Sequence, residues 1–133
     1  MLFWGRFLGN QIHGNGGFIF MQKRNFKGKC IKVTSPKSKE ICRTYDDVQL
    51  AYFKLLESRD NIKEIRCSVP LEDLPDNEYM TDFVCVKSDN DPMVRECLKH
   101  RLLTKPLTVK LLDISRNYWL SHGISDWGIV IDE

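Results

Sequence analysis

Two short stretches dominated by apolar residues, separated by a compact polar turn, form the clearest pattern along the chain. Residues 82–87 and 93–98 are rich in β-branched and aromatic side chains, which favours extended strands. Residues 88–92 between them are Ser, Asp, Asn, Asp and Pro, which are types that bond their own backbone or fix φ. We therefore predict a β-hairpin within Met80–Lys99.

Apolar residues at helical spacing lie on both sides of this hairpin. The first such pattern covers Asp46–Ser58, and either Thr44 or Asp46 can cap its start. The second begins with Pro106, and Gly123 is placed to end it. Its expected apolar stripe consists of Leu107, Leu111, Ile114, Tyr118 and Trp119.

Three further segments have strand character: residues 30–33, residues 62–69 and residues 127–131. The main order is then helix, strand, strand, strand, helix, strand. A helical crossover makes the last strand parallel to its neighbour, so the sheet should be mixed. We expect an α/β sandwich in which one helix covers each face of a central mixed sheet.

The overall composition is that of one ordinary folded domain. The chain has 133 residues, of which 42% are hydrophobic and 29% charged, and this excludes a disordered protein. It has no apolar run long enough to span a bilayer. The five cysteines are scattered and form no C-x-x-C pair, so we predict reduced thiols in a cytoplasmic protein rather than disulfides or a zinc site.

Charge is distributed unevenly. Residues 21–43 carry eight Lys and Arg against one Glu, whereas the chain from residue 44 onward carries 11 Lys and Arg against 17 Asp and Glu. Such a basic arm on an acidic body predicts contact with phosphate, and the alternative is a solvated tail with no partner. The candidate DNA-binding residues are Lys23, Arg24, Lys27, Lys29, Lys32, Lys37 and Lys39.

Residues 1–20 show neither a helical nor a strand period and lack the features of a signal peptide. The codons of residues 15–17 can form a purine-rich ribosome-binding sequence, and the codon of Met21 follows at a suitable distance. Translation of the biological protein would then begin at Met21. We expect residues 1–20 to be a translated leader or a disordered segment. The alternative is a short apolar segment that packs on the folded domain or on a partner. We take the folded domain to span residues 44–133.

The hairpin carries two acids in otherwise apolar surroundings. Asp82 opens its first strand and Glu96 interrupts its second. Buried carboxylates are costly unless they are paired or bind a metal. With Lys99 nearby, the hairpin is therefore a candidate site for a divalent metal ion.

From Tyr45 to its end, the chain resembles the N-terminal catalytic domain of the TnsA-type transposon endonucleases, which have the PD-(D/E)XK, restriction-endonuclease-like fold. The resemblance is carried by YDDVQLAYFKLLE leading into NIKEIRCSVPLED, by MTDFVCV, and by KPLTVKLLDISRNYWLSHGISDWGIVIDE. It implies an endonuclease that uses Mg²⁺ or Mn²⁺ to hydrolyse mobile-element DNA, with a transposase or another mobile-element protein as partner.

The resemblance assigns roles to four residues. Asp82 falls on the metal-binding Asp, and Glu96 is the second metal ligand. Gln49 occupies the place of a helix Glu, for which Asp46 or Asp47 is a substitute. The catalytic Lys corresponds to Lys99, one residue later than in the family pattern, with Arg95 and Arg101 as alternatives.

The late position of Lys99 leaves its orientation open. Strict strand alternation puts Glu96 and Lys99 on opposite faces, whereas a β-bulge, or a register that uses residues 97–99, would bring Lys99 round. The implied site is non-standard. The alternative function is therefore a catalytically inactive nuclease-fold module that binds DNA or a partner protein, and an unrelated function on the same sandwich is a third reading.

Overall fold

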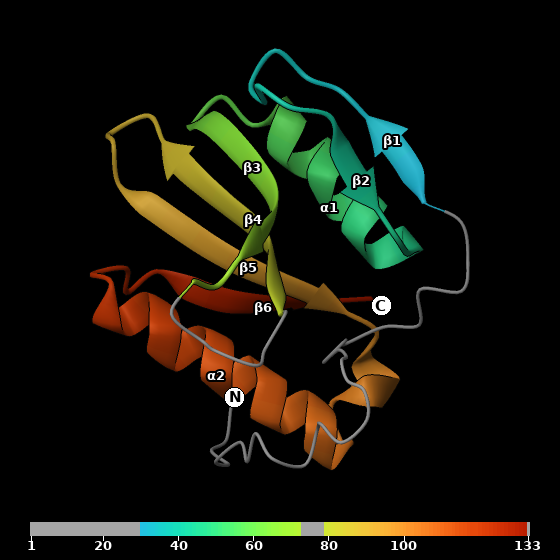
Figure 1. Cartoon of the computed structure of the whole chain (residues 1–133). Helices are drawn as coiled ribbons and strands as arrows, with labels where there is room; N and C mark the ends of the chain where they lie inside the picture. Colours follow the sequence, from blue (N-terminus) through green and yellow to red (C-terminus); the bar gives the residue numbers. More distant parts are fainter. Residues whose placement is uncertain (1–29, 73–78, 133) are drawn as a thin grey trace.

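The computed structural model describes residues 30–72 and 79–132 of the chain (Figure 1). The expectations for residues 1–20 and for four of the basic residues lie outside this part. Those four residues are Lys23, Arg24, Lys27 and Lys29.

A four-stranded mixed sheet forms the centre of the molecule, as the sequence pattern predicted. Its strands are β3 (Ile62–Pro70), β4 (Met80–Lys87), β5 (Pro92–Leu98) and β6 (Trp127–Ile131), in the order β3-β4-β5-β6. The first three strands are antiparallel neighbours, and β6 pairs parallel with β5. Helix α2 (Pro106–Ser121) makes the crossover between β5 and β6, after one 3₁₀ turn at His100–Leu102.

The two helices cover opposite faces of this sheet, an arrangement that is compatible with the predicted α/β sandwich (Figure 1). Helix α1 (Asp47–Ser58) begins where Asp46 Oδ1 accepts a hydrogen bond from the backbone N–H of Gln49, at 2.9 Å. Its side of the sheet holds an apolar cluster that includes Phe53 and Phe83. A second cluster, which includes Val94 and Trp119, fills the α2 side.

The stripe predicted for α2 is partly wrong. Leu107 is 49% exposed because it lies in the first turn and faces away from the sheet. Two polar residues, Thr108 and Ser115, lie instead on the buried side of the helix. The predicted end of α2 is observed, since Gly123 has a φ of 87°, which suits glycine.

Residues 31–44 fold as a two-stranded antiparallel ribbon. It consists of β1 (Ile31–Val33) and β2 (Cys42–Thr44), and β2 was not predicted. We call this element the β1–β2 ribbon. It lies beside α1 and β3, so this part of the basic arm belongs to the folded body (Figure 1).

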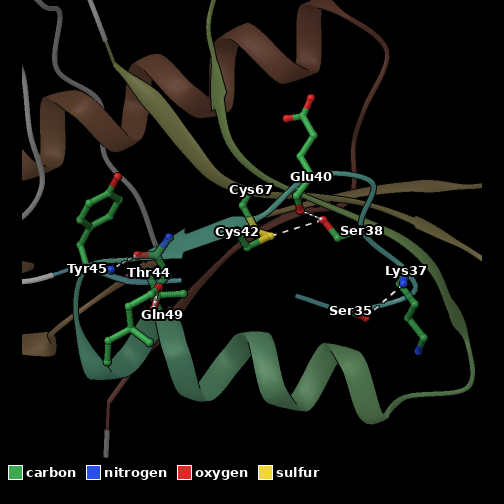
Figure 2. Close-up of a disulfide and its surroundings, with 10 residues drawn as sticks. Ser35, Lys37, Ser38, Glu40, Cys42, Thr44, Tyr45, Gln49 and Cys67 are labelled. Carbon is green, nitrogen blue, oxygen red and sulfur yellow. Dashed lines mark hydrogen bonds between the residues drawn. A yellow bond between two sulfur atoms is a disulfide. The ribbon is translucent and has the colours of Figure 1, made fainter. Parts of the chain in front are cut away.

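The prediction that all cysteines are reduced is wrong. Cys42 of β2 and Cys67 of β3 form a disulfide across a sequence separation of 25 residues, with their Cα atoms 5.5 Å apart (Figure 2). Sequence spacing could not reveal this pair because only the folding of the ribbon over β3 brings the two residues together. The other three cysteines are free thiols, and burial raises the pKa of Cys85 to about 12.

Among the helices of the described residues, none has the length and apolar character needed to cross a membrane.

Candidate functional site

The two hairpin acids lie side by side at the centre of the sheet. Phe83 pairs with Arg95 in the β4–β5 ladder, which puts Asp82 opposite Glu96. The backbone N–H of Asp82 donates to Glu96 Oε1 at 3.2 Å, and the backbone N–H of Cys97 donates to Asp82 Oδ2 at 2.8 Å. Each carboxylate therefore bonds the main chain of the opposite strand, where the regular ladder has ended.

Both acids are removed from solvent. Asp82 is 3% exposed and Glu96 is 0% exposed. Their hydrogen bonds from backbone N–H groups offset part of the cost of burying a carboxylate. In this arrangement the acids already serve a structural purpose, because they hold the ends of β4 and β5 together.

The second oxygen of Glu96 is held from the α2 side. Ser115 Oγ donates to Glu96 Oε2 at 2.5 Å, and Trp127 Nε1 donates to Ser115 Oγ at 3.0 Å. This chain of bonds runs from β5 through α2 to β6. Sequence analysis missed Ser115, and the one available signal was a small polar residue within the apolar face of a helix.

The strand alternation is broken at Asp82. Thr81 Oγ1 accepts a hydrogen bond from Trp119 Nε1 on the α2 side, at 2.8 Å. Phe83 contacts Tyr52 on the α1 side, with 5.7 Å between ring centroids. Residues two apart in a regular strand share a face, so β4 is irregular between these two positions. Ser68, on the paired strand at this level, has a φ of 54°.

Strand β5 remains regular, and this decides the orientation of the predicted catalytic Lys. Its register with β6 is continuous from Val94 to Leu98. Lys99 Nζ pairs with Asp47 Oδ1 on α1, at 3.3 Å, whereas Glu96 bonds to α2. Strict alternation is therefore observed, and the structure places Lys99 and Glu96 on opposite faces of the sheet.

Gln49 lies buried near the start of α1. Its Oε1 accepts a hydrogen bond from the backbone N–H of Tyr45 at 2.9 Å, and its Nε2 has no hydrogen-bond partner among the described residues. The side chain therefore helps to fix the entry into the helix.

The expected metal would have only the two hairpin acids as charged ligands among the described residues. In the ranges 30–72 and 79–132, no three His, Cys, Asp or Glu side chains are grouped so that they could hold a metal ion. Glu96 has both oxygens bonded within the protein, and Lys99 is directed to the other face. Asp82 and Glu96 thus lie side by side, with no third His, Cys, Asp or Glu grouped with them in the described residues.

Two of the predicted DNA-binding residues that the structure describes, Lys32 and Lys37, differ in what their side chains bond. Lys32 is exposed and lies directly opposite the exposed Arg43 in the β1–β2 ribbon. Lys37, in contrast, donates from Nζ to three backbone carbonyls at the end of α1, those of Leu56, Glu57 and Arg59, at 3.4, 2.9 and 2.6 Å. Lys32 is available to a ligand, whereas Lys37 acts as a cap for the helix.

An open groove of about 660 Å³ is lined by residues 36–42 and by residues 63–70 of β3. Four cationic side chains line it: Lys37, Lys39, Lys63 and Arg66. Two carboxylates, Glu40 and Glu64, also line it, so its net charge is positive. The contribution of β3 was not predicted, because an exposed strand with mixed charges carries no distinctive sequence signal.

A cluster of three charged side chains holds the start of β6 against the hairpin. Asp126 accepts from Lys87 Nζ at 2.7 Å and from Arg95 Nη2 at 2.8 Å. Partial burial works against the charge of Asp126, but the hydrogen bonds from both cations outweigh it and lower the pKa of this carboxyl. The hydrogen bond between Lys87 and Asp126, together with nearby carboxylates, raises the pKa of Lys87.

No protein-family model matches the chain, and a comparison with curated proteins finds no match.

Proposed function

We propose that this chain is a DNA-binding module built on a nuclease-like α/β sandwich, and that it holds DNA without cleaving it. The observation that carries the proposal is the cross-strand pair Lys32 and Arg43 on the exposed side of the β1–β2 ribbon. Like charges directly opposite each other in a sheet destabilise it, and an anion lying over both of them relieves the repulsion. The DNA backbone supplies such anions in a regular array.

The cationic groove adds further positive charge next to the ribbon, where residues 36–42 face β3. Lys39 lies in the segment that joins β1 and β2, and Arg66 lies on the neighbouring strand. Both side chains belong to exposed residues. Contacts of this kind hold the backbone of DNA and carry no base specificity, so we expect binding that depends weakly on sequence.

The arrangement at the hairpin favours binding over hydrolysis. Both oxygens of Glu96 bond protein donors, and Lys99 pairs with Asp47 on the other face of the sheet. Hydrolysis of a phosphodiester at this site would need a cation that the DNA can reach. Glu96 is fully buried, so a cation bound to it would lie away from the DNA backbone.

The test compares the variant Lys32→Gln/Arg43→Gln with a matched control, Lys54→Gln/Arg59→Gln, which removes two exposed cations elsewhere. Affinity for a fluorescent duplex of about 30 base pairs is measured by anisotropy at low salt. We expect the ribbon variant to bind about 10-fold more weakly or worse, and the control to stay within about 3-fold. Equal losses in the two variants would contradict a specific role for the ribbon.

A second candidate function is metal-dependent cleavage of mobile-element DNA, in the manner of the TnsA-type endonucleases that the chain resembles. One observation favours it: Asp82, on which the resemblance places the metal-binding Asp, lies beside Glu96 at the centre of the sheet. A transposase or another mobile-element protein would then be the partner.

Plasmid nicking with Mg²⁺ or Mn²⁺ separates the two functions. Cleavage by the wild-type protein that is lost in Asp82→Asn, and retained in the exposed-turn variant Asp91→Asn, would establish the endonuclease and exclude the binding-only proposal. If the protein binds DNA but leaves the plasmid intact, the binding module stands.

A further inference from the structure

The disulfide lies in the wall of the cationic groove. Cys42 and Cys67, whose disulfide Figure 2 shows, both line it, together with Ile41, Arg66 and Ser68. The two sulfur-bearing residues differ in access, because Cys42 is 1% exposed whereas Cys67 is partly exposed. Cys67 is therefore the more exposed residue of the pair.

The charges around the disulfide favour an anionic visitor. Lys39, Lys63 and Arg66 line the groove and belong to exposed residues. The carboxylate of Glu40 points away from the disulfide, toward solvent (Figure 2). A groove lined mainly by one sign of charge raises the local concentration of ions of the opposite sign.

We propose that the Cys42–Cys67 disulfide is a thiol-exchange site that takes small anionic thiols, with Cys67 as the sulfur attacked. The thiolate of the visitor attacks Cys67 Sγ, the bond to Cys42 Sγ breaks, and Cys42 leaves as a thiolate. A second thiolate attacks the mixed disulfide on the visitor's sulfur. It releases the oxidised visitor as a symmetrical disulfide and leaves Cys67 as a thiolate, so two thiols are oxidised for each protein disulfide reduced.

Ser38 is positioned to assist the leaving sulfur. Its Oγ lies 3.6 Å from Cys42 Sγ and donates to the backbone carbonyl of Glu40 at 2.6 Å (Figure 2). A disulfide sulfur is a weak acceptor, so in the oxidised protein the hydroxyl proton bonds the carbonyl. When Cys42 becomes a thiolate, rotation of the same hydroxyl gives it a hydrogen bond, and a stabilised thiolate leaves faster.

This proposal goes beyond DNA binding and does not depend on it. Reduction removes the covalent link between the β1–β2 ribbon and β3. A backbone hydrogen bond from Ile65 N to Lys37 O, at 2.9 Å, still joins the two parts. The redox state of the disulfide therefore determines whether the ribbon is attached to the sheet covalently or only by packing and hydrogen bonds.

The test uses two thiols of similar size and opposite charge, 2-mercaptoethanesulfonate and cysteamine, on the folded oxidised protein at low salt. Rates of reduction are corrected for the thiolate fraction of each reagent. We expect the anionic thiol to react about 3-fold faster or more, because the groove concentrates anions. In samples quenched with acid at early times, mass spectrometry of peptides should find the adduct on Cys67.

Two variants identify the source of the preference. Lys39→Gln/Arg66→Gln should bring the ratio of the two rates close to one, whereas Lys54→Gln, on the exposed side of α1, should leave it unchanged. Ser38→Ala should slow both thiols alike, since it acts on the leaving group. Three results would overturn the proposal: an adduct on Cys42, equal rates for the two thiols, or a disulfide that resists both reagents unless the protein is unfolded.

Discussion

Ser115 links three secondary-structure elements through one hydroxyl group. It donates to the buried Glu96 and accepts from Trp127, so it connects β5, α2 and β6 (Figure 1). A buried carboxylate that loses such a donor keeps its charge but loses part of the solvation that the protein provides. The orientation of Glu96 toward α2 therefore depends on this serine.

The variant Ser115→Ala should lower the free energy of unfolding by about 1–3 kcal/mol, because it removes the donor to Glu96 and the acceptor of Trp127 within the interior. Urea denaturation measures the change. Ser121→Ala is the matched control, since that hydroxyl is exposed at the end of the same helix, and it should change stability by less than about 0.5 kcal/mol. Equal effects of the two substitutions would show that Ser115 does not hold Glu96.

Asp126 makes stability depend on pH in the acid range. Partial burial opposes the charge of Asp126, but the hydrogen bonds from Lys87 and Arg95 outweigh it and lower the pKa of this carboxyl below its ordinary value. A carboxyl whose pKa is lower in the folded state stabilises the fold at pH values above its pKa in the unfolded chain. This contribution is lost as pH falls through the lowered folded value.

The variant Asp126→Asn should therefore be less stable than the wild type at pH 7, and the gap should narrow as pH falls below about 4. Denaturation at several pH values between 7 and 2 measures the gap. Asp60→Asn, which alters an exposed carboxyl, should show neither effect. A gap that stays constant down to pH 2 would contradict the role of the ionic cluster.

At the scale of elements, α1 is completed at both ends by residues outside it. Asp46 caps its first turn, and Lys37, 20 residues before Glu57 in sequence, caps its last. The final carbonyls of a helix have no partners within it and carry partial negative charge, so an ammonium group there satisfies both needs. The segment that joins β1 and β2 is thereby attached to the end of α1.

The variant Lys37→Gln should lower the free energy of unfolding by about 1–2 kcal/mol, because the shorter neutral side chain cannot reach the helix carbonyls. Lys39→Gln removes an equal charge from an exposed side chain nearby and should cost less than about 0.5 kcal/mol. Thermal and urea denaturation of both variants make the comparison. If Lys39→Gln proved as costly as Lys37→Gln, the effect would be one of net charge and not of capping.

The elements that local sequence predicts well are those whose signals lie within a few residues. The cap at Asp46, the end of α2 at Gly123 and the bounds of β6 are of this kind. The three residues of β2 alternate between buried and exposed, but a segment this short gives no distinctive signal, and β2 pairs with β1 and is joined to β3 by the disulfide. Its prediction would have required the tertiary structure.

The candidate site shows the same limit. That Asp82 and Glu96 would lie together followed from the hairpin alone, since register in a hairpin is a local property. The side of the sheet on which Lys99 lies depended on whether β5 contains a bulge. The pairing of β5 with β6 is regular, and Lys99 lies on the α1 side. The bond from Ser115 to Glu96 joins residues 19 apart through the crossover helix, so no local pattern announces it.

At the scale of the whole molecule, two sheets are joined by one covalent bond. The disulfide closes a loop of 25 residues that contains all of α1, and the ribbon it attaches presents the pair Lys32 and Arg43. Closing a loop of this size restricts the unfolded chain and is worth about 3 kcal/mol. In the folded protein, it also limits the movement of the ribbon relative to β3.

The redox state of this disulfide should therefore change the affinity for DNA. A ribbon that is tied to the sheet holds its two cations in place before DNA arrives, whereas a released ribbon must be ordered on binding, at a cost in affinity. We expect the reduced protein to bind a duplex about 3- to 10-fold more weakly than the oxidised protein at the same salt concentration. Anisotropy titrations in matched oxidising and reducing buffers measure the ratio.

The variant Cys42→Ser/Cys67→Ser provides the control, because it lacks the disulfide in either buffer. Its affinity should equal that of the reduced wild type and should not respond to the buffer. The comparison separates the two proposals. If neither form binds DNA, the binding module is wrong while the exchange chemistry at Cys67 stands on its own test. If both forms bind equally well, the ribbon does not need its covalent tie to hold the two cations in place for DNA.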